Sequence, residues 1–503
     1  MSRINTNVQS QIAQRILTTN QASLAQSLER LSTGVKINRG KDDPAGLIAS
    51  NALGSELRAT NAAIQNAERA DQVVNIAEGG LQEISGLLTD LQGLLNSTAS
   101  KAGLSQDEKQ ANQLQIDSIL QTIDRISSSS SFQGIKLLNG NFDFKTSGVA
   151  TGVADFRING AKFEGSSLNV NVNVTLSAQQ AGLLVSVGGA TLDIASNESF
   201  VLEISGSKGS RELSFSDGTD LTTIASTINQ YTEITGVAAS VSGSTGLKVY
   251  SSAYGSNEFV NVKVLDDGGL GSSTGGIYQL SSQAFLSADS ASRTALDANN
   301  ARNGIRDSGQ DLRATVNGVA ATANGRTLRV NTDFLDTEIT LTSGTARSLG
   351  TTTAFRITGG GAEFQLASKI DVAGRVSLGI RDVAARKLGN SEIGYLSQLA
   401  SGKANNVVAG DLDGAQKIVN ESIAQISSLR GRLGAFQQNT IGATIRNLNV
   451  AAENTSAAQS VIRDADFAAE TAKLTRAQIL VSGSTNILSL ANSQPQTVLQ
   501  LLG

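Results

Sequence analysis

A single apolar seam through residues 48–97 constrains the fold of this chain more than any other feature. Its members recur at intervals of three, four or seven residues over six heptads, as in a helix that packs along one face. The seam consists of Leu53, Leu57, Ile64, Ala67, Val74, Ala77, Leu81, Ile84, Leu88, Leu91 and Leu95. At 1.5 Å per residue such a helix extends about 75 Å, so the sequence predicts a rod.

A second helix is expected to follow in the same N-terminal third, at about 107–128. The C-terminal third repeats this periodicity, and Asp413 is expected to cap a helix there that continues past Leu448. Near the end, Ala477, Val481, Leu488, Ala491, Val498 and Leu502 fall on a heptad grid. Neither end can bury its apolar face alone, so we expect the two arms to pack on each other or on neighbouring copies.

Both extremities are unusually poor in charge. Residues 1–28 carry only Arg3 and Arg15, and residues 477–503 carry no charged side chain. The N-terminal arm has apolar positions at Ile4, Val8, Ile12, Ile16, Leu24, Leu28 and Leu31. An ordinary solvated coiled coil normally shows charges beside its seam, whereas uncharged polar faces favour a wall inside an assembly, ordered on association. Polar residues interrupt the last segment too often for membrane insertion.

The centre of the chain has a different pattern. Of 51 glycines, 29 lie within 145–375, and LNVNVNVTL at 168–176 alternates strictly between apolar and polar residues. Asn159-Gly160, Asn317-Gly318 and Asn324-Gly325 are typical of hairpin turns. We therefore predict an α+β fold, in which both termini form a long antiparallel helical rod and residues 177–365 form a β-rich inserted domain.

No catalytic, cofactor or metal site is predicted. The absence of Cys and His excludes zinc sites built on those residues and thiol or imidazole nucleophile pairs. Ser205 and Lys208 have an S-x-x-K spacing without partner motifs, and Asp411 and Asp413 lack the acidic ligands of a calcium loop. The net charge of −4 gives no indication of nucleic-acid binding.

Several segments resemble the bacterial flagellins. They are LSTGVKINRGKDDPAGLIAS at 31–50, FQGIKLLNG at 132–140, LRGRLGAFQQN at 429–439 and NVAAENTSAAQSVIRDADFAAET at 449–471. The similarity covers about 1–180 and 375–503, and ASTINQYTEITGVAASVSG at 225–243 resembles an insertion motif of some flagellins. The resemblance implies a subunit that polymerises into the extracellular filament used for swimming, and it implies no enzymatic activity.

The resemblance also implies a division of the chain. The inner-tube helices (D0) are expected at 1–31 and 456–503, the spoke at 32–46, the outer-tube segments (D1) at 47–176 and 366–455, and the variable domain at 177–365 with its insertion motif near 219–264. D1 packing is expected to depend on Leu88, Leu91, Leu95, Arg430, Leu433, Gly434 and Phe436.

The spoke contains Pro44, one of two prolines in 503 residues. Gly34 is expected to end the first helix in a left-handed conformation, and Asp43, beside Asp42, to cap the next. Pro44 then lies in the first turn, where its missing N–H costs nothing. A stiff break of this kind suits a link between the inner and the outer tube.

The partners implied are further copies of the chain, an export chaperone on the C-terminal arm, the type III export apparatus, the filament cap and the hook-associated proteins. Alignment with flagellins detected by Toll-like receptor 5 places Asp90 at an Arg position and Gln115 at a Glu position, with Leu94 retained, so we expect weak recognition. The alternatives are a hook–filament junction protein or a surface adhesin acting through the insert. The family's His-dependent metalloprotease insert is excluded because the chain has no His.

Overall fold

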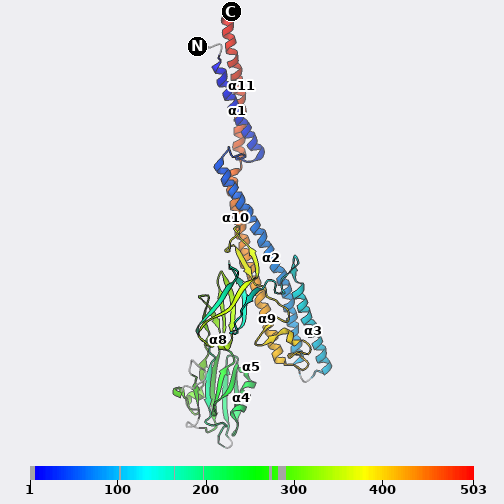
Figure 1. The fold of residues 1–503 in the computed structure, drawn as a ribbon, viewed down its shortest axis with the longest axis vertical. Coiled ribbons are helices and arrows are strands. Elements are labelled where there is room, and N and C mark those ends of the chain that lie inside the picture. Colours follow the sequence, from blue (N-terminus) through cyan, green and yellow to red (C-terminus); the bar gives the residue numbers. More distant parts are fainter. Residues whose placement is uncertain are drawn as a thin grey trace. The chain divides into compact units, whose positions relative to one another are not determined.

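The computed structural model describes residues 6–100, 103–163, 165–195, 198–270, 275–280 and 290–502, without the side chains of 495–502 (Figure 1). The chain divides into two compact units. Unit 1 comprises Met1–Gln72, Phe364–Arg375 and Gly434–Gly503, and unit 2 comprises Val73–Glu363 and Val376–Leu433. Each unit therefore combines segments from both halves of the sequence, as expected for a rod built by the two termini.

Unit 1 is helical. It contains α1 (Val8–Thr33), the first part of α2 (Pro44–Thr98), a π-helical turn (Phe436–Ile441), α10 (Gly442–Arg463) and α11 (Phe467–Leu502). The C-terminal rod helix was expected to continue past Leu448, and the chain is helical throughout 412–463, with the π-helical turn inside it. The break between α10 and α11 lies at 464–466, later in the chain than the division between 455 and 456 that the family resemblance implies.

The helices of unit 2 confirm the long seam. Leu81, Ile84, Leu88 and Leu91 in α2 are fully buried, as are the facing side chains of α3 (Gln106–Ser129) and α9 (Leu412–Ala435). The facing residues are Ile116, Ile123, Ala415, Ile418, Val419 and Leu433. A seam of this length is recoverable from sequence because one periodic face stays buried throughout.

The cap of α9 differs from the prediction. The helix begins at Leu412, one residue before Asp413, and the Asp413 backbone N–H donates to the Asp411 carboxylate at 3.1 Å. Asp411 is thus the capping residue, and Asp413 lies in the first turn. Either carboxylate suits a helix start, so the spacing alone did not distinguish them.

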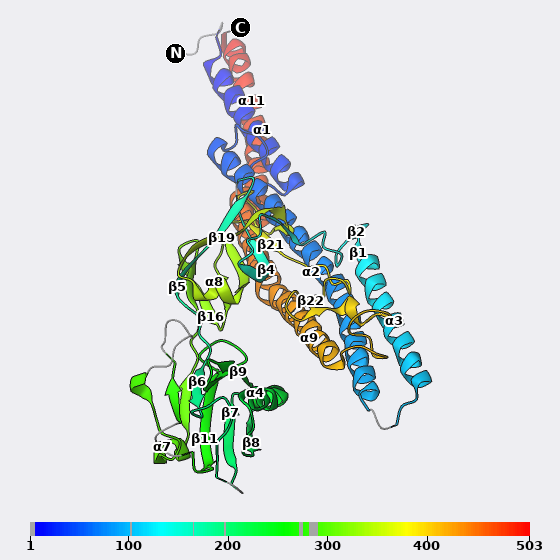
Figure 2. The ribbon, with the colours of Figure 1, turned by 60° about the horizontal axis from the view of Figure 1, so that its bottom comes forward.

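Two β-lobes complete unit 2 (Figure 2). In the first, the sheets β15-β14-β5-β19-β3 and β16-β17-β18-β4 enclose one apolar core. The strands are β3 (Phe144–Ser147), β4 (Val153–Ala161), β5 (Leu168–Leu176), β14 (Arg313–Val316), β15 (Val319–Ala320), β16 (Thr322–Asn324), β17 (Thr327–Asn331), β18 (Leu335–Leu341) and β19 (Gly350–Gly360), with α8 (Ser343–Arg347). Val170, Val172 and Val174 of β5 point into the core, which confirms the alternating strand.

In the second lobe, the sheets β12-β6-β10-β9 and β13-β11-β7-β8 share another core with α4. The elements are β6 (Gly182–Ser186), β7 (Phe200–Gly206), β8 (Ser210–Phe215), α4 (Leu221–Gln230), α5 (Thr232–Thr235), β9 (Val237–Ser242), β10 (Gly246–Ser251), β11 (Phe259–Asp267), β12 (Gly276–Gln279), α7 (Asn299–Asn303) and β13 (Ile305–Ser308). Short ribbons elsewhere are β1 (Ser131–Phe132) with β2 (Ile135–Lys136), and β22 (Gly389–Asn390) with β23 (Gly394–Tyr395); β20 (Ala362–Gln365) and β21 (Arg375–Leu378) are also short.

Two expectations about the insert differ from the structure. β5 pairs with β14 and β19, so the first lobe begins before residue 177 and the predicted boundary cuts through it. Asn159-Gly160 is no turn, because both residues lie inside β4 beside an irregularity in its pairing with β18. Asn317-Gly318 does form a turn, with both residues at positive φ, and the turn near Asn324 contains Gly325.

Candidate assembly surface

α1 and α11 lie side by side in antiparallel orientation (Figure 1). The Asn7 amide donates to the Ala491 carbonyl at 2.8 Å, and the Asn20 amide donates to the Ser484 hydroxyl at 2.6 Å. The buried positions of the pair are small or polar. They are Ala13, Ser27, Glu470, Ala477, Ser484 and Ala491. Small side chains allow close approach of the two backbones, and the amide bonds fix their register.

The apolar positions predicted for the N-terminal arm largely lie outside this contact. Val8, Ile12 and Ile16, here called the α1 stripe, are 51%, 39% and 48% exposed. Leu28 is 49% exposed, whereas Leu24 and Leu31 are half-buried. Ile4 lies outside the described residues. The α1 stripe is thus a free apolar face of the subunit and not the seam of its helix pair.

The α11 helix carries half-buried apolar side chains as well as exposed ones. Val481 and Leu488 are half-buried on the predicted heptad grid, while the side chains of Val498 and Leu502 are outside the described part of the chain. Its other face carries a second exposed set, here called the α11 stripe. The α11 stripe consists of Ile479, Leu480, Ile487 and Leu490, which are 46–66% exposed. These four residues were not predicted as a set, although spacings of seven and eleven residues place them on one face of the helix.

The break between α1 and α2 forms as predicted. Gly34 adopts φ = 70° and its N–H donates to the Arg30 carbonyl at 2.9 Å. Asp43 accepts from the Gly46 N–H at 2.9 Å, and α2 begins at Pro44. The Asp42 carboxylate closes the intervening loop by accepting two backbone N–H groups.

Those two groups belong to Arg39, at 2.9 Å, and Asn38, at 3.1 Å. The Arg39 N–H lowers the pKa of Asp42 most, with Asn38 and the positive charges of Arg30 and Lys41 adding to the effect. The charged form of Asp42 is therefore the form that holds the loop.

Backbone hydrogen bonds tie this break to the one between α10 and α11, a connection that was not predicted from the sequence. Val35 forms an isolated antiparallel bridge with Asp464, and the Ala465 N–H donates to the Gly34 carbonyl at 3.0 Å. The Lys36 N–H donates to the Arg463 carbonyl at 2.6 Å. We call residues 34–43 and 464–466 together the joint. Backbone bonds of this kind carry no side-chain signature, so only the fold reveals them.

A buried carboxylate lies next to the joint. Glu470 is 4% exposed, and its side chain lies 3.1 Å from the Lys473 ammonium and 3.9 Å from the Arg30 guanidinium. A buried charge requires such partners because its desolvation is costly. This cluster fixes α1 against α11 at the end of the pair nearest the joint.

The residues predicted for D1 packing divide into two groups. Leu88, Leu91, Leu95 and Leu433 are buried, and the Arg430 guanidinium pairs with Glu78 of α2 at 2.8 Å. Phe436 lies 6.3 Å from the Phe364 ring centroid. Gly434 is not in close contact with a neighbouring segment, because a Cβ at this position would meet no atom within 4 Å. The subunit alone thus provides no packing reason for that glycine.

The receptor-equivalent positions are accessible. Asp90 on α2 and Gln115 on α3 are exposed, and Leu94 is half-buried. No described helix is long and apolar enough to span a membrane. Within the described residues, no group of three or more acidic side chains is placed to hold a metal ion.

Three family models match the chain. The bacterial flagellin N-terminal helical region matches residues 4–143, the bacterial flagellin C-terminal helical region matches 416–502, and the flagellin hook IN motif matches 199–253. The terminal matches contain α1, the joint and α11, which are the elements that carry both exposed stripes.

Curated relatives match over almost the whole length. A flagellin of Salmonella typhimurium and the B-type flagellin of Pseudomonas aeruginosa are each 29% identical, and a flagellin of Salmonella choleraesuis is 27% identical. Each alignment covers 99% of this chain and 99% of the relative. Among solved structures, FliC from Burkholderia pseudomallei is 17% identical over 73% of this chain and 98% of that chain, with a TM-score of 0.22.

Proposed function

The chain belongs to the bacterial flagellin family and is a structural subunit of the extracellular flagellar filament, and from this premise we propose that its two apolar stripes are covered by further copies of the chain around a hollow axis. The observation that carries the proposal is the helix pair of α1 and α11, whose own contact uses small and polar residues and leaves larger apolar side chains in water. Seven such side chains form the two stripes. Covering them is the main gain that association offers.

Glycines on the long helix support self-association of unit 2 as well. Gly79, Gly86 and Gly93 recur every seven residues on the exposed face of α2, and a Cβ at each would meet open space. Glycine inside a helix is destabilising by about 0.5–1 kcal/mol relative to alanine. Because the subunit offers no packing reason for them, we propose that they admit close approach of a neighbouring copy.

The joint is proposed to act as the spoke between the inner and the outer tube. Its support is the number of bonds that hold it: the Gly34 cap, the Asp42 and Asp43 loop bonds and the bridge from Val35 to Asp464. A joint held in this way transmits a change in subunit packing instead of absorbing it.

Before assembly, the same stripes need protection. We propose that an export chaperone covers the α11 stripe and that the chain passes unfolded through the type III apparatus to grow beneath the filament cap, next to hook-associated proteins. The exposure of Ile487 and Leu490, 62% and 64%, supports a partner of apolar character. Substituting both with Ser is expected to abolish chaperone capture in a pull-down, whereas the matched exposed change Gln478→Ser leaves it intact.

Recognition by Toll-like receptor 5 is proposed to be weak. Asp90 places a negative charge where the recognised flagellins carry a positive one. A reversed charge at a desolvated contact weakens binding by several kcal/mol. The variant Asp90→Arg with Gln115→Glu is expected to raise the response of receptor reporter cells. Full potency of the unchanged protein contradicts the proposal.

The family matches favour a filament subunit over a junction protein or an adhesin. Electron microscopy of seeded polymerisation tests the assembly proposal directly. The full chain should form fibres, and a chain without 1–33 and 467–503 should remain monomeric while keeping the circular dichroism of unit 2. Fibres of normal diameter from the truncated chain would refute the role of the stripes.

A further inference from the structure

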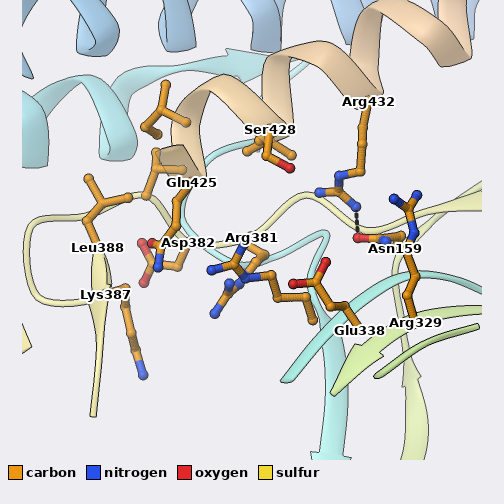
Figure 3. A pocket seen from close by; sticks show the side chains of 14 residues that line it. Asn159, Arg329, Glu338, Arg381, Asp382, Lys387, Leu388, Gln425, Ser428 and Arg432 are labelled. Atoms are coloured by element: carbon orange, nitrogen blue, oxygen red, sulfur yellow. Dashed lines mark hydrogen bonds between the residues drawn. The ribbon is translucent and has the colours of Figure 1, made fainter. Parts of the chain in front are cut away.

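A small cavity in unit 2 lies where α9 meets the sheet β16-β17-β18-β4 and the segment 381–388 (Figure 3). Its volume is about 70 Å³. A water molecule needs about 10–15 Å³ on this measure, so the space holds several waters or one tetrahedral ion. Five basic side chains from four separate segments line it. They are Arg157, Arg329, Arg381, Lys387 and Arg432.

Two carboxylates also line the cavity, and one of them is already engaged. Asp382 accepts from the Arg386 guanidinium at 2.6 Å, which leaves Glu338 as the other acid. Arg157 pairs with Glu421 at 2.9 Å and lies 3.6 Å from Asp155. The lining is therefore more positive than negative in a protein whose net charge is −4.

Three of the lining cations have no such pair. In the part of the chain that the structure describes, no carboxylate oxygen lies within 4.0 Å of the charged nitrogens of Arg329, Arg381 or Lys387. In Figure 3, Arg329 comes from one side of the cavity, while Arg381 and Lys387 come from the segment 381–388. Arg329 and Lys387 are exposed and Arg381 is half-buried, so an anion from solution can reach all three. Arg381 also lies near the Asp143 carboxylate, whose pKa is raised by burial and lowered in part by the charge of Arg381.

Arg432 adds a desolvated cation to this group. Arg432 lies on α9, and its guanidinium donates to the side-chain oxygen of Asn159 (Figure 3). Burial lowers the pKa of Arg432 to about 10; Asp336 and Glu338 oppose this effect, while Arg381 and Arg157 add to it. A neutral amide oxygen satisfies one donor but supplies no charge.

We propose that this cavity binds a tetrahedral oxyanion, phosphate or sulfate, between Arg329, Arg381, Lys387 and Arg432. Guanidinium and ammonium groups donate several hydrogen bonds to such an ion and neutralise it. A second cavity of about 320 Å³ shares Arg157, Arg381, Asp382 and Lys387 with the first. The oxyanion can therefore be a free ion or the end of a phosphate or sulfate ester whose alcohol part occupies the larger space.

The test is calorimetric titration of the full chain, kept monomeric by dilution, with inorganic phosphate, inorganic sulfate and glucose 6-phosphate at constant ionic strength. We expect saturable binding, and a rise of about 2 °C in the melting midpoint at ten times the dissociation constant. Binding of the inorganic ions alone identifies a free ion, and binding of the sugar phosphate as well identifies an ester site. Absence of saturable binding by all three overturns the proposal.

Variants separate the site from general salt effects. Arg381→Gln and Lys387→Gln should each weaken binding about tenfold, and Lys387→Arg should largely retain it. The matched control is Arg125→Gln, an exposed residue of α3 that lines neither cavity. If the control weakens binding as much as Arg381→Gln, the effect is one of net charge and the site is refuted. Two variants of the cavity are used so that the test still stands if one of them fails to fold.

Discussion

Replacing Ile487 and Leu490 with Ser tests whether the α11 stripe drives assembly. The two side chains are 62% and 64% exposed in the subunit. Full burial of such a side chain stabilises by about 1.5–3 kcal/mol, so covering the exposed part is worth about 1–2 kcal/mol each. The double variant should therefore lose about 2–4 kcal/mol of association free energy, which raises the critical concentration for polymerisation about 30- to 900-fold.

The subunit itself should change little. Because both side chains already face water, the free energy of unfolding should shift by less than about 0.5 kcal/mol. The assay is sedimentation of polymer grown from filament seeds, with denaturant unfolding of the monomer measured in parallel. The control, Gln478→Ser, changes an exposed uncharged residue of the same helix. A normal critical concentration for the double variant, or an equal loss in the control, refutes the reasoning.

Four further outcomes are expected. Pro44→Gly should alter filament waveform in electron micrographs more than it alters monomer stability, because it loosens the joint, and wild-type waveforms would contradict this. The pKa of Asp42 lies below its ordinary value of 3.8, so the hydrogen bonds of its carboxylate persist above pH 3.8 and are lost as the pH falls through the lowered pKa. Hydrogen exchange at the joint should accelerate only at that low pH. The variant Asp42→Asn should remove this pH dependence. Gly86→Ala should stabilise the monomer by about 1 kcal/mol in denaturant unfolding and yet impair seeded polymerisation, whereas unimpaired growth would count against a neighbour at that face. Arg430→Met should destabilise unit 2 by about 1–2 kcal/mol because Glu78 stays partly buried without its partner, and a double-mutant cycle with Glu78→Gln should recover part of that loss.

The sequence predicted features that depend on one face of one element. The seam from Leu81 to Leu91 is buried as expected, and the alternation from Val170 to Val174 is a strand as expected. Gly34 takes the left-handed conformation that ends α1. Each of these follows from local chemistry that no distant segment overrides.

Features decided by a distant partner were not predictable in the same way. Ile12 and Ile16 were expected in a seam, but Ala13 contacts α11 because small residues permit closer packing. Asn159-Gly160 has the composition of a turn, yet its place beside β18 keeps it extended. The cavity around Arg381 and Arg432 joins four segments that are distant along the chain, 157–159, 329–338, 381–388 and 425–432, and no spacing indicates it.

The bridge between Val35 and Asp464 places the two breaks of unit 1 in the same cross-section. Any bending there must turn both covalent connections at once, so they share a single hinge axis. A protease cut within 34–43 should therefore leave α1 attached through α11, and the nicked subunit should migrate as one particle until denaturant separates its fragments.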